Sequence, residues 1–267
     1  MSLRHFTPHR NRRRGISSRA QKILYTVLFL AILFQVFYPL AHGDTLQYLT
    51  FAVVYSGALA MLLHAFYSFG WRYAFRYFAI TFIFSFLIEE MGLRTGWPFG
   101  TYSYDPSLGP QLVGIPFIVP FAWLMMVHPI LLVARRVTQH WVFLYGGAAL
   151  MAWDLFLDPM MVSAHRWTWT FTDSHVPFEP EIPLSNAAGW LFAGMGLIAL
   201  LHISLPRERR KQGAEFTAVD IFLSWTLFSG VVGNLFFYHQ PGIALFAGGI
   251  FALVLAPYAF ARWLGQP

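Results

Sequence analysis

Long apolar runs alternate with polar segments along the whole chain. These runs match the roughly 17–25 residues that an α-helix needs to cross a lipid bilayer. They predict eight membrane-spanning helices, with two longer loops at 93–114 and 161–183. The expected helices cover 22–40, 46–69, 73–92, 115–134, 141–160, 184–204, 216–237 and 242–262.

The composition supports an integral membrane protein and excludes an ordinary soluble domain. Hydrophobic residues make up 57% of the 267 residues and charged residues 11%, whereas soluble domains contain about 25% charged residues. We therefore expect an all-α fold, a polytopic bundle of about eight transmembrane helices. A basic arm at 1–21 precedes a single transmembrane domain at 22–267. The chain has no cysteine, which excludes disulfides and thiol nucleophiles.

The basic residues predict the orientation of the bundle, because Lys and Arg gather on the cytoplasmic side of a membrane protein. With a cytoplasmic N-terminus, 16 of the 18 Lys and Arg residues fall on that side, and Arg94 and Arg166 fall outside. Both termini are thus expected in the cytoplasm of a multi-pass protein of the cell membrane. Because the basic residues lie between apolar runs, the net charge of +6 does not predict a nucleic-acid partner.

Four acidic residues lie where an apolar helix should carry none. Glu89 and Glu90 close the third run, and Asp154 and Asp158 lie near the end of the fifth. Glu89 follows Arg76 by 13 residues, a rise of about 20 Å in an apolar layer about 30 Å thick. A charge there costs about 2.5–3.5 kcal/mol, and the negative end of the helix dipole also opposes a carboxylate. These effects favour the neutral acid, which suits a general acid.

The same acids also allow a purely structural explanation. Asp154 and Asp158 are four residues apart and share one helical face, and Arg166 in the following loop could pair with Asp158. Arg94 lies four residues after Glu90 and could pair with it in the headgroup layer. Two acid pairs at matched depth, each followed by a loop rich in aromatic residues, favour a functional site over this explanation.

Prolines and isolated polar residues give further expectations. Pro159 disfavours the helical conformation at Asp158, so the fifth helix is expected to end there. Three prolines in the fourth run predict a broken or kinked helix that lines a cavity. The three prolines are Pro116, Pro120 and Pro129, and Trp123 and His128 are expected on the cavity wall. Asn186 is expected to cap the sixth helix, and Asn234 is expected to form a hydrogen bond across helices.

The sequence lacks the motifs of several other chemistries. Its ten histidines show no metal-binding spacing such as HExxH. It also contains no nucleophile elbow, no Walker loop and no dinucleotide fingerprint. The sequence therefore predicts neither a metal site nor a cofactor.

Three long stretches resemble the carotenoid biosynthesis membrane protein family, which contains the carotenoid 1′,2′-hydratases. They occur in the family's order and read EEMGLRTGWPFGTYSYDPSLGPQLVGIPFIVPFAWLMM (Glu89–Met126), AWDLFLDPMMVSAHRWTW (Ala152–Trp169) and IPLSNAAGW (Ile182–Trp190). The resemblance implies a hydro-lyase that adds water to the terminal C1=C2 double bond of an acyclic carotenoid and gives a tertiary alcohol. It also implies a hydrophobic carotenoid substrate, and other enzymes of carotenoid biosynthesis as candidate partners.

The residues of these stretches suit that chemistry. Hydrating a trisubstituted alkene needs a proton donor, a positioned water and a base. Adjacent residues point about 100° apart on a helix, so one of Glu89 and Glu90 is expected to donate the proton. Asp154 and Asp158 are expected to orient the water as base. Aromatic faces can stabilise the intermediate cation, and those expected along the substrate are Trp97, Phe99, Tyr102, Tyr104, Trp123 and Trp167.

Two other kinds of function fit parts of the same pattern. An end-group cyclase or an enzyme that adds a prenyl unit would act on a similar alkene, although DLFLD is not the DDxxD of a magnesium–diphosphate site. A cyclase would also have to keep water away from the cation. A transporter would use the membrane acids as a proton relay, but it predicts an inverted repeat that the sequence does not show.

Overall fold

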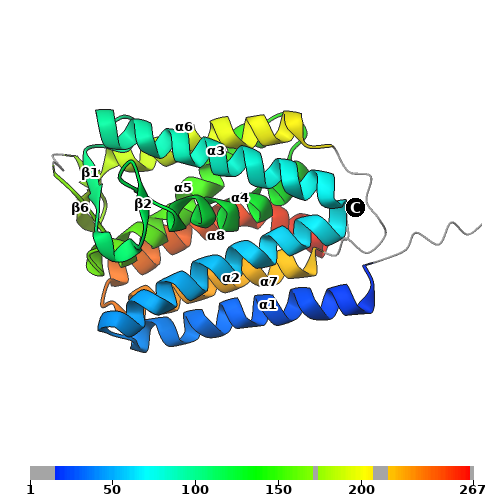
Figure 1. The fold of residues 1–267 in the computed structure, drawn as a ribbon, viewed down its shortest axis with the longest axis horizontal. Coiled ribbons are helices and arrows are strands. Elements are labelled where there is room, and N and C mark those ends of the chain that lie inside the picture. The colour runs from blue at the N-terminus through cyan, green and yellow to red at the C-terminus, as the bar shows by residue number, and fades with distance from the viewer. Residues whose placement is uncertain (1–15, 171–173, 207–215, 265–267) are drawn as a thin grey trace, which may run out of the picture.

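Each of the eight apolar runs forms one helix in the computed structural model, which describes residues 16–170, 174–206 and 216–264. The expected ranges agree with the helices within five residues at each end. Most of the predicted basic arm lies outside the described residues. The helices, shown in Figure 1, are α1 Ser18–Phe37, α2 Gly43–Phe69, α3 Trp71–Thr95, α4 Ile118–Val137, α5 Val142–Ser163, α6 Leu184–Ser204, α7 Thr217–Val232 and α8 Pro241–Trp263.

Six helices of the described chain are long and apolar enough to cross a membrane, namely α1, α2, α4, α6, α7 and α8. Two short helical segments, η1 (Tyr38–Leu40) and η3 (Gly233–Phe237), extend α1 and α7. The other two, α3 and α5, carry the two acid pairs. They have 25 and 22 residues, so length does not prevent them from spanning the bilayer. A helical membrane architecture is confirmed, whereas crossing by all eight helices and cytoplasmic termini stay predictions.

Helix α4 is the central helix of the bundle. Every side chain from Trp123 to Ala134 is buried, because α4 packs against α2, α3 and α5 and also contacts α6, α7 and α8. The helix is continuous although Pro129 lies inside it, so a break is wrong, whereas a kink stays a prediction. Pro120 lies in the first turn, where a missing N–H leaves no helical hydrogen bond unmade. Pro116 lies before the helix, in a short strand.

Helix α5 continues through Pro159 to Ser163, so the expectation that it ends at residue 158 is wrong. The additional turn buries Met161 and Val162 in the core. Its carbonyl groups accept hydrogen bonds from the N–H groups of residues 164–166. Burial and these bonds offset the hydrogen bond that proline cannot donate.

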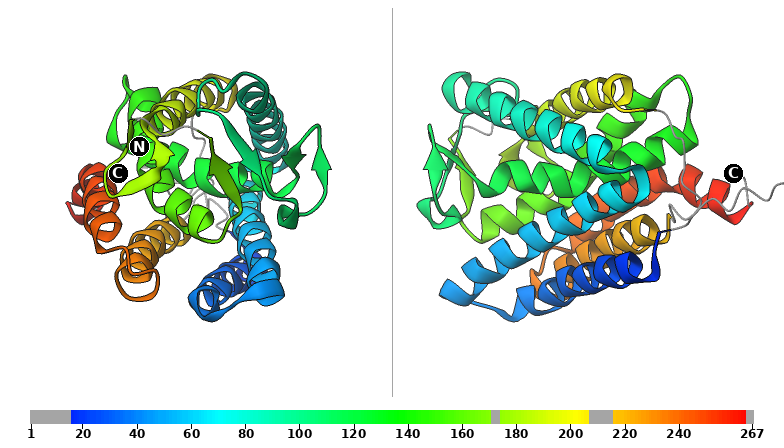
Figure 2. Two further views of the ribbon diagram at one scale, coloured as in Figure 1. Left: turned by 90° about the vertical axis from the view of Figure 1, so that its left-hand side faces the viewer. Right: turned by 45° about the vertical axis from the view of Figure 1, so that its right-hand side comes forward.

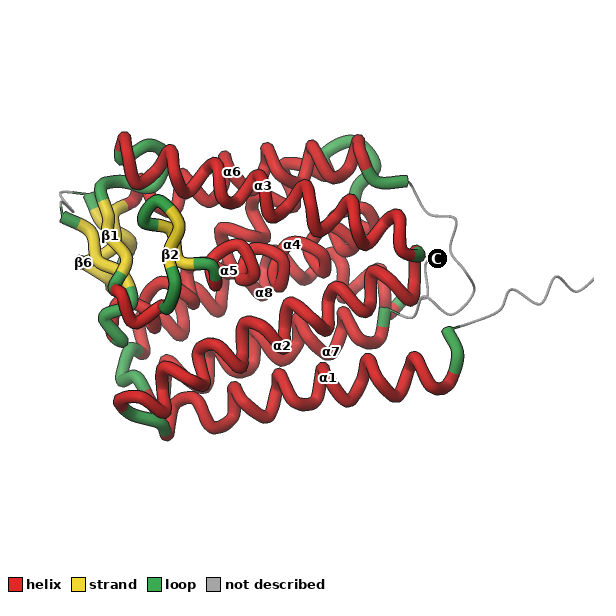
Figure 3. Tube along the Cα trace, viewed as in Figure 1, coloured by secondary structure: helices red, strands yellow, loops and turns green. Residues whose placement is uncertain are grey.

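The two long loops form short antiparallel ribbons, which modify the expected all-α fold. They lie together at one end of the bundle, called here the strand end (Figures 2 and 3). The ribbons are β1 (Tyr102–Tyr104) with β4 (Trp167–Trp169), β2 (Gln111–Leu112) with β3 (Ile115–Pro116), and β5 (His175–Val176) with β6 (Glu179–Pro183).

Basic residues gather at the other end, called here the opposite end, where α1 begins and α8 ends (Figure 1). Arg72 lies at the start of α3, Arg135 and Arg136 lie in the last turn of α4, and Arg262 lies in the last turn of α8. The two acid pairs lie toward the strand end of α3 and α5. The fold therefore places the two acid pairs and these four basic residues at opposite ends of the bundle, as the charge pattern predicts.

Helices α5 and α6 approach each other closely through small residues. A Cβ atom on Gly147 would lie 2.7 Å from the Leu191 carbonyl oxygen, and one on Gly194 would lie 3.1 Å from the Gly147 Cα atom. Such small residues allow helix backbones to come together in membranes. This contact brings the start of α6 beside the acidic end of α5.

Candidate active site

Glu89 lies near the end of α3, and its side chain points into the bundle. It is 4% exposed. Its Oε2 atom accepts hydrogen bonds from Tyr102 Oη at 2.6 Å and Tyr104 Oη at 2.8 Å, and its Oε1 atom accepts one from Trp123 Nε1 at 3.1 Å. Gly92 makes room for this arrangement, because a Cβ atom there would lie 2.8 Å from the Tyr102 hydroxyl. All three donors are neutral groups.

The two tyrosines of β1 keep their protons. Burial is the main cause that raises the pKa of Tyr102 and of Tyr104 well above the usual value for tyrosine, and the nearby Glu89 carboxyl raises both further. Each hydroxyl therefore remains a hydrogen-bond donor to Glu89. The strand alternation places both rings on the same face of β1.

Glu90 points to another side of α3, as expected for the residue next to Glu89. It forms a salt bridge with Arg94 at 2.9 Å, and its side chain is 28% exposed. This is the structural pairing that the spacing of four residues allows. Glu89 therefore belongs to the buried cluster, whereas the position of Glu90 does not support its expected place in the site.

Asp154 and Asp158 lie on one face of α5, and they are 1% and 3% exposed. The side-chain amide of Asn186, in the first turn of α6, donates to Oδ2 of Asp154 at 3.1 Å and also to Oδ2 of Asp158. Trp167 Nε1 donates to Oδ1 of Asp158 at 3.1 Å. Among the described residues, Oδ1 of Asp154 has no hydrogen-bond partner.

The β1–β4 ribbon connects the two acid groups. Tyr104 is paired with Trp167 in the ribbon register, and their rings meet edge to face with centroids 5.9 Å apart. Tyr104 donates to Glu89, while Trp167 donates to Asp158. One cross-strand pair therefore holds acids from two different helices beside a common space.

A cavity of about 350 Å³ lies at this place, and both Glu89 and Asp158 line it. Asp154 lies behind Asp158 and does not reach the cavity wall. Five of the six aromatic residues expected along the substrate line the cavity, and Trp97 does not, because it lies at the surface with 60% of its area exposed. The five are Phe99, Tyr102, Tyr104, Trp123 and Trp167.

The cavity extends from the acids toward the side of the bundle between α1 and α7. Val36 of α1, Phe228 of α7 and Phe237 of η3 line it and are also exposed on the outside. Trp225 Nε1 donates a hydrogen bond to the Gln35 side chain across these two helices. The walls of this part are predominantly apolar, so it suits a hydrocarbon chain.

Two residues of the site were not recognised in the sequence as members of it. Asn186 was expected to cap α6, but the residue before the helix is Pro183, and Asn186 instead bonds to both aspartates. Trp190 lines the cavity and stacks on Trp123 with ring centroids 4.3 Å apart. Asn186 and Trp190 are four residues apart, so their shared helical face was the available signal.

Three other expectations are corrected by the positions of the side chains. His128 lies outside the cavity wall, and its Nε2 atom is 2.9 Å from His64 Nδ1 in the buried core. Asn234 donates to the Gly230 carbonyl of its own helix rather than across helices. Arg166, a possible partner of Asp158, donates instead to the Ser107 hydroxyl at 2.6 Å.

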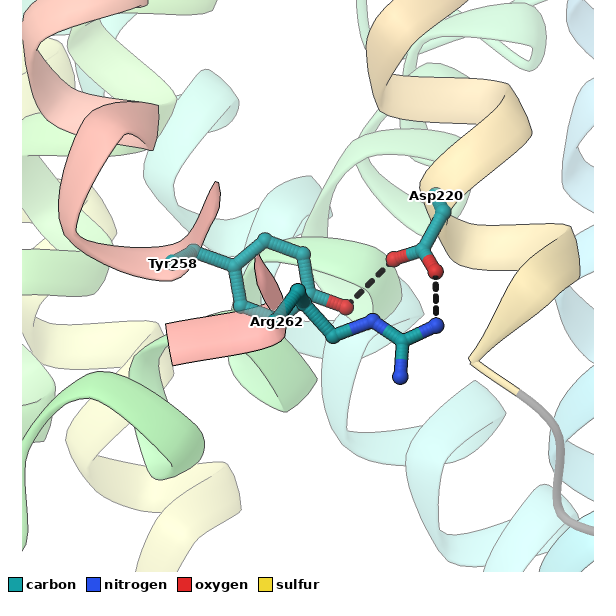
Figure 4. Close-up of polar contacts among 3 residues, drawn as sticks. All are labelled: Asp220, Tyr258 and Arg262. Carbon is teal, nitrogen blue, oxygen red and sulfur yellow. Dashed lines mark hydrogen bonds and ion pairs between the residues drawn. The ribbon is translucent and has the colours of Figure 1, made fainter. Parts of the chain in front are cut away.

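A separate polar cluster lies at the opposite end of the bundle (Figure 4). Asp220 of α7 accepts hydrogen bonds from Tyr258 Oη and Arg262 Nη2 of α8, each at 2.5 Å. None of these three residues lines the cavity. This cluster joins two helices and lies apart from the acids of the strand end.

The sequence matches a known protein family over most of its length. Over 165 residues it is 32% identical to a protein named bisanhydrobacterioruberin hydratase from Haloarcula japonica; the match covers 58% of this chain and 54% of that protein, so the chain spans about half the length of this curated relative. No solved structure matches the chain. Residues 48–255, which include every member of the acid cluster, match the family described as carotenoid biosynthesis protein. The chain belongs to the carotenoid biosynthesis protein family.

Proposed function

We propose that this protein adds water to the terminal C1=C2 double bond of an acyclic carotenoid end group and gives a tertiary alcohol. It would then be a hydro-lyase, a carbon–oxygen lyase. Family membership and the relative named as a hydratase support this proposal. The observation that carries it is the presence of two separate carboxyl groups, Glu89 and Asp158, on the wall of one aromatic cavity.

The proposed reaction requires both of these groups. A proton is added to C2, and the alkene becomes a tertiary cation at C1. Water then bonds to C1 and loses a proton to a base. One carboxyl group serves as the acid and the other as the base, while faces such as those of Trp123 and Trp190 stabilise the cation. Fixed groups act more strongly on such a charge in a cavity of low polarity than in water.

The shape of the cavity supports a long apolar substrate. Its volume of about 350 Å³ lies at the small end of the ~300–1,000 Å³ of ligand cavities, so it suits an end group rather than a whole carotenoid. The remaining chain would leave between α1 and α7 and stay in the bilayer. Such a substrate needs no passage through water.

An isotope experiment tests the reaction. Membranes containing the protein are supplied with an acyclic carotenoid in oxygen-18 water, and the pigments are analysed by mass spectrometry. We expect a product heavier by one labelled water, with the label in the new hydroxyl group. Membranes without the protein serve as the control. A product of unchanged mass would indicate cyclisation or isomerisation, and unlabelled oxygen in the hydroxyl would indicate an oxygenase.

The cellular setting follows from the same proposal. The protein would lie in the cell membrane with the strand end outside, beside other enzymes that make or consume its carotenoid. Single cysteines at Ser103 and Gln139, on the strand end and the opposite end, test the orientation because the native chain has none. An impermeant maleimide should label intact cells at Ser103, and labelling at Gln139 alone would reverse the orientation.

A further inference from the structure

We propose that the proton given to the alkene resides on the Asp154–Asp158 pair, that Asn186 is the positioning residue of this pair, and that Glu89 is the carboxylate base. The inference rests on the proposed hydration and assigns its roles in the reverse of the order expected from the sequence. It is carried by the hydrogen-bond donors and acceptors around each acid.

The surroundings of Glu89 fit an ionised carboxylate. Its two oxygen atoms accept three hydrogen bonds, from Tyr102, Tyr104 and Trp123. An ionised carboxylate only accepts, and an indole N–H only donates. A proton on Oε1 would face the Trp123 N–H, which cannot accept it, whereas a proton on Oε2 needs one tyrosine hydroxyl to turn and accept. With all three donors directed at it, Glu89 rests as the carboxylate, and Oε2 is the atom that can take a proton during the reaction.

The surroundings of the aspartates fit a pair that holds one proton. Oδ2 of Asp154 and Oδ2 of Asp158 both accept a hydrogen bond from the one amide nitrogen of Asn186, so the two carboxyl groups lie side by side. Two buried carboxylates this close do not both stay ionised. Oδ1 of Asp154 has no partner among the described residues, which leaves that carboxyl group with unused capacity for a proton.

Asn186 fixes the geometry of this pair. Its single amide nitrogen donates to Oδ2 of both aspartates, so it holds the two carboxyl groups side by side. Asn186 also lines the cavity next to Asp158. The close packing of α5 and α6 places it there, because Gly147 and Gly194 allow the two backbones to approach each other.

These assignments give a balanced reaction. The proton held on Asp154 passes to Asp158, which lines the cavity and donates it to C2 as the alkene electron pair forms the new C–H bond. A water molecule bonds to the cation at C1. One of its two protons goes to the Glu89 carboxylate, and the other stays in the new hydroxyl group. The product is the neutral alcohol, and return of the proton from Glu89 to the aspartate pair restores the enzyme. Asp154 acts through Asp158 and is a positioning residue.

Infrared spectroscopy of the purified protein tests the location of the proton without any substrate. A protonated carboxylic acid has a C=O stretch that is separate from the carboxylate bands. We expect this band at neutral pH in the wild type and in Glu89→Gln, and we expect the double variant Asp154→Asn/Asp158→Asn to lose it. Asp220→Asn is the control and should retain it. A band that survives in the double variant, or that disappears in Glu89→Gln, overturns the assignment.

Substitution of Asn186 tests its positioning role and also covers the case in which the double variant does not fold. Asn186→Leu should shift the same infrared band and the pH profile of kcat, and it should lower kcat by about 10–100-fold, the loss of a hydrogen bond to a charged group. Asn234→Leu removes another buried amide and should move neither the band nor the pH profile. A lower kcat with both unchanged would mean that Asn186 only packs α6 against α5.

The two tests separate this inference from the proposed function. The infrared band reports on the proton even if the substrate is a different carotenoid or the reaction is a cyclisation. Conversely, oxygen-18 can appear in the product while the band belongs to Glu89. A product without added water would overturn the hydration alone. An infrared band that belongs to Glu89 would overturn only the roles given to the acids.

Discussion

The strand end and the opposite end of the bundle each contain a carboxyl group that accepts a hydrogen bond from tyrosine, but the other hydrogen-bond donors to the two carboxyl groups differ. Asp220 accepts from Tyr258 and from the Arg262 guanidinium, whereas Glu89 accepts from two tyrosines and an indole. A guanidinium balances the charge of Asp220 and makes it a structural link between helices. Glu89 is held by neutral groups in the buried interior, where a charge is costly. Because of this cost, we propose that Glu89 serves the chemistry of the site rather than the stability of the fold.

The largest expected effect concerns activity at the strand end. Glu89→Gln keeps the shape of the side chain but removes the base, so kcat should fall by about 10²–10⁴-fold, the usual contribution of acid–base catalysis. The measurement is carotenoid turnover in membranes with matched protein levels.

Two matched controls sharpen this comparison. Glu90→Gln changes the neighbouring acid, which is bonded to Arg94 outside the cavity, and Asp220→Asn changes the acid of the opposite end. Both should stay within a few-fold of wild type. If Glu89→Gln also stays within that range, the buried acid is structural and the distinction between the two ends fails.

An intermediate effect is expected along the side of the cavity. Ser229 of α7 lines the part that leads between α1 and α7. Ser229→Trp should fill this space and exclude the chain of a long carotenoid, which should raise its KM by about tenfold or more, or about 1.4 kcal/mol or more of lost binding. A short analogue of the end group should bind as before. Leu245→Trp, on the exposed side of α8, is the control, and an equal change in KM there would exclude the proposed path.

The smallest effect is expected on stability, where the variant of the opposite end should lose more than the variant of the strand end. Asp220→Asn removes a partly exposed salt bridge, so the free energy of unfolding should fall by about 0.2–1 kcal/mol. Glu89→Gln removes a buried charge while keeping an acceptor for its donors, so it should leave stability unchanged or raise it. Thermal unfolding in detergent measures both. A larger loss for Glu89→Gln than for Asp220→Asn would contradict the comparison.

The helices were largely predictable because burial in a membrane requires long apolar runs. The positions and lengths of the apolar runs located all eight within a few residues. The errors at Pro129 and Pro159 have a common physical cause. Local rules give the cost of proline in a helix, but they do not contain the gain from burying the next turn in the core, as at Met161.

The site was predictable in its acids but not in its contacts. Depth in the membrane distinguished Glu89 and the aspartates from ordinary surface residues. The choice between Glu89 and Glu90 depends on which face of α3 meets the bundle, and that is decided by packing between helices far apart in the sequence. Asn186 was missed for the same reason. An asparagine near a helix start favours a cap, and its role follows only once α5 lies against α6.

The register of the β1–β4 ribbon restricts how the loops of the strand end can change in length. A shift of one residue along a strand moves every side chain to the other face. Tyr102 and Tyr104 would turn away from Glu89, and a shift of the partner strand would turn Trp167 away from Asp158. One residue inserted within either three-residue strand would therefore disturb the hydrogen bonds of an acid that lies on a helix, outside the strand itself. Insertions in the turns beyond the ribbon would leave both acids as they are.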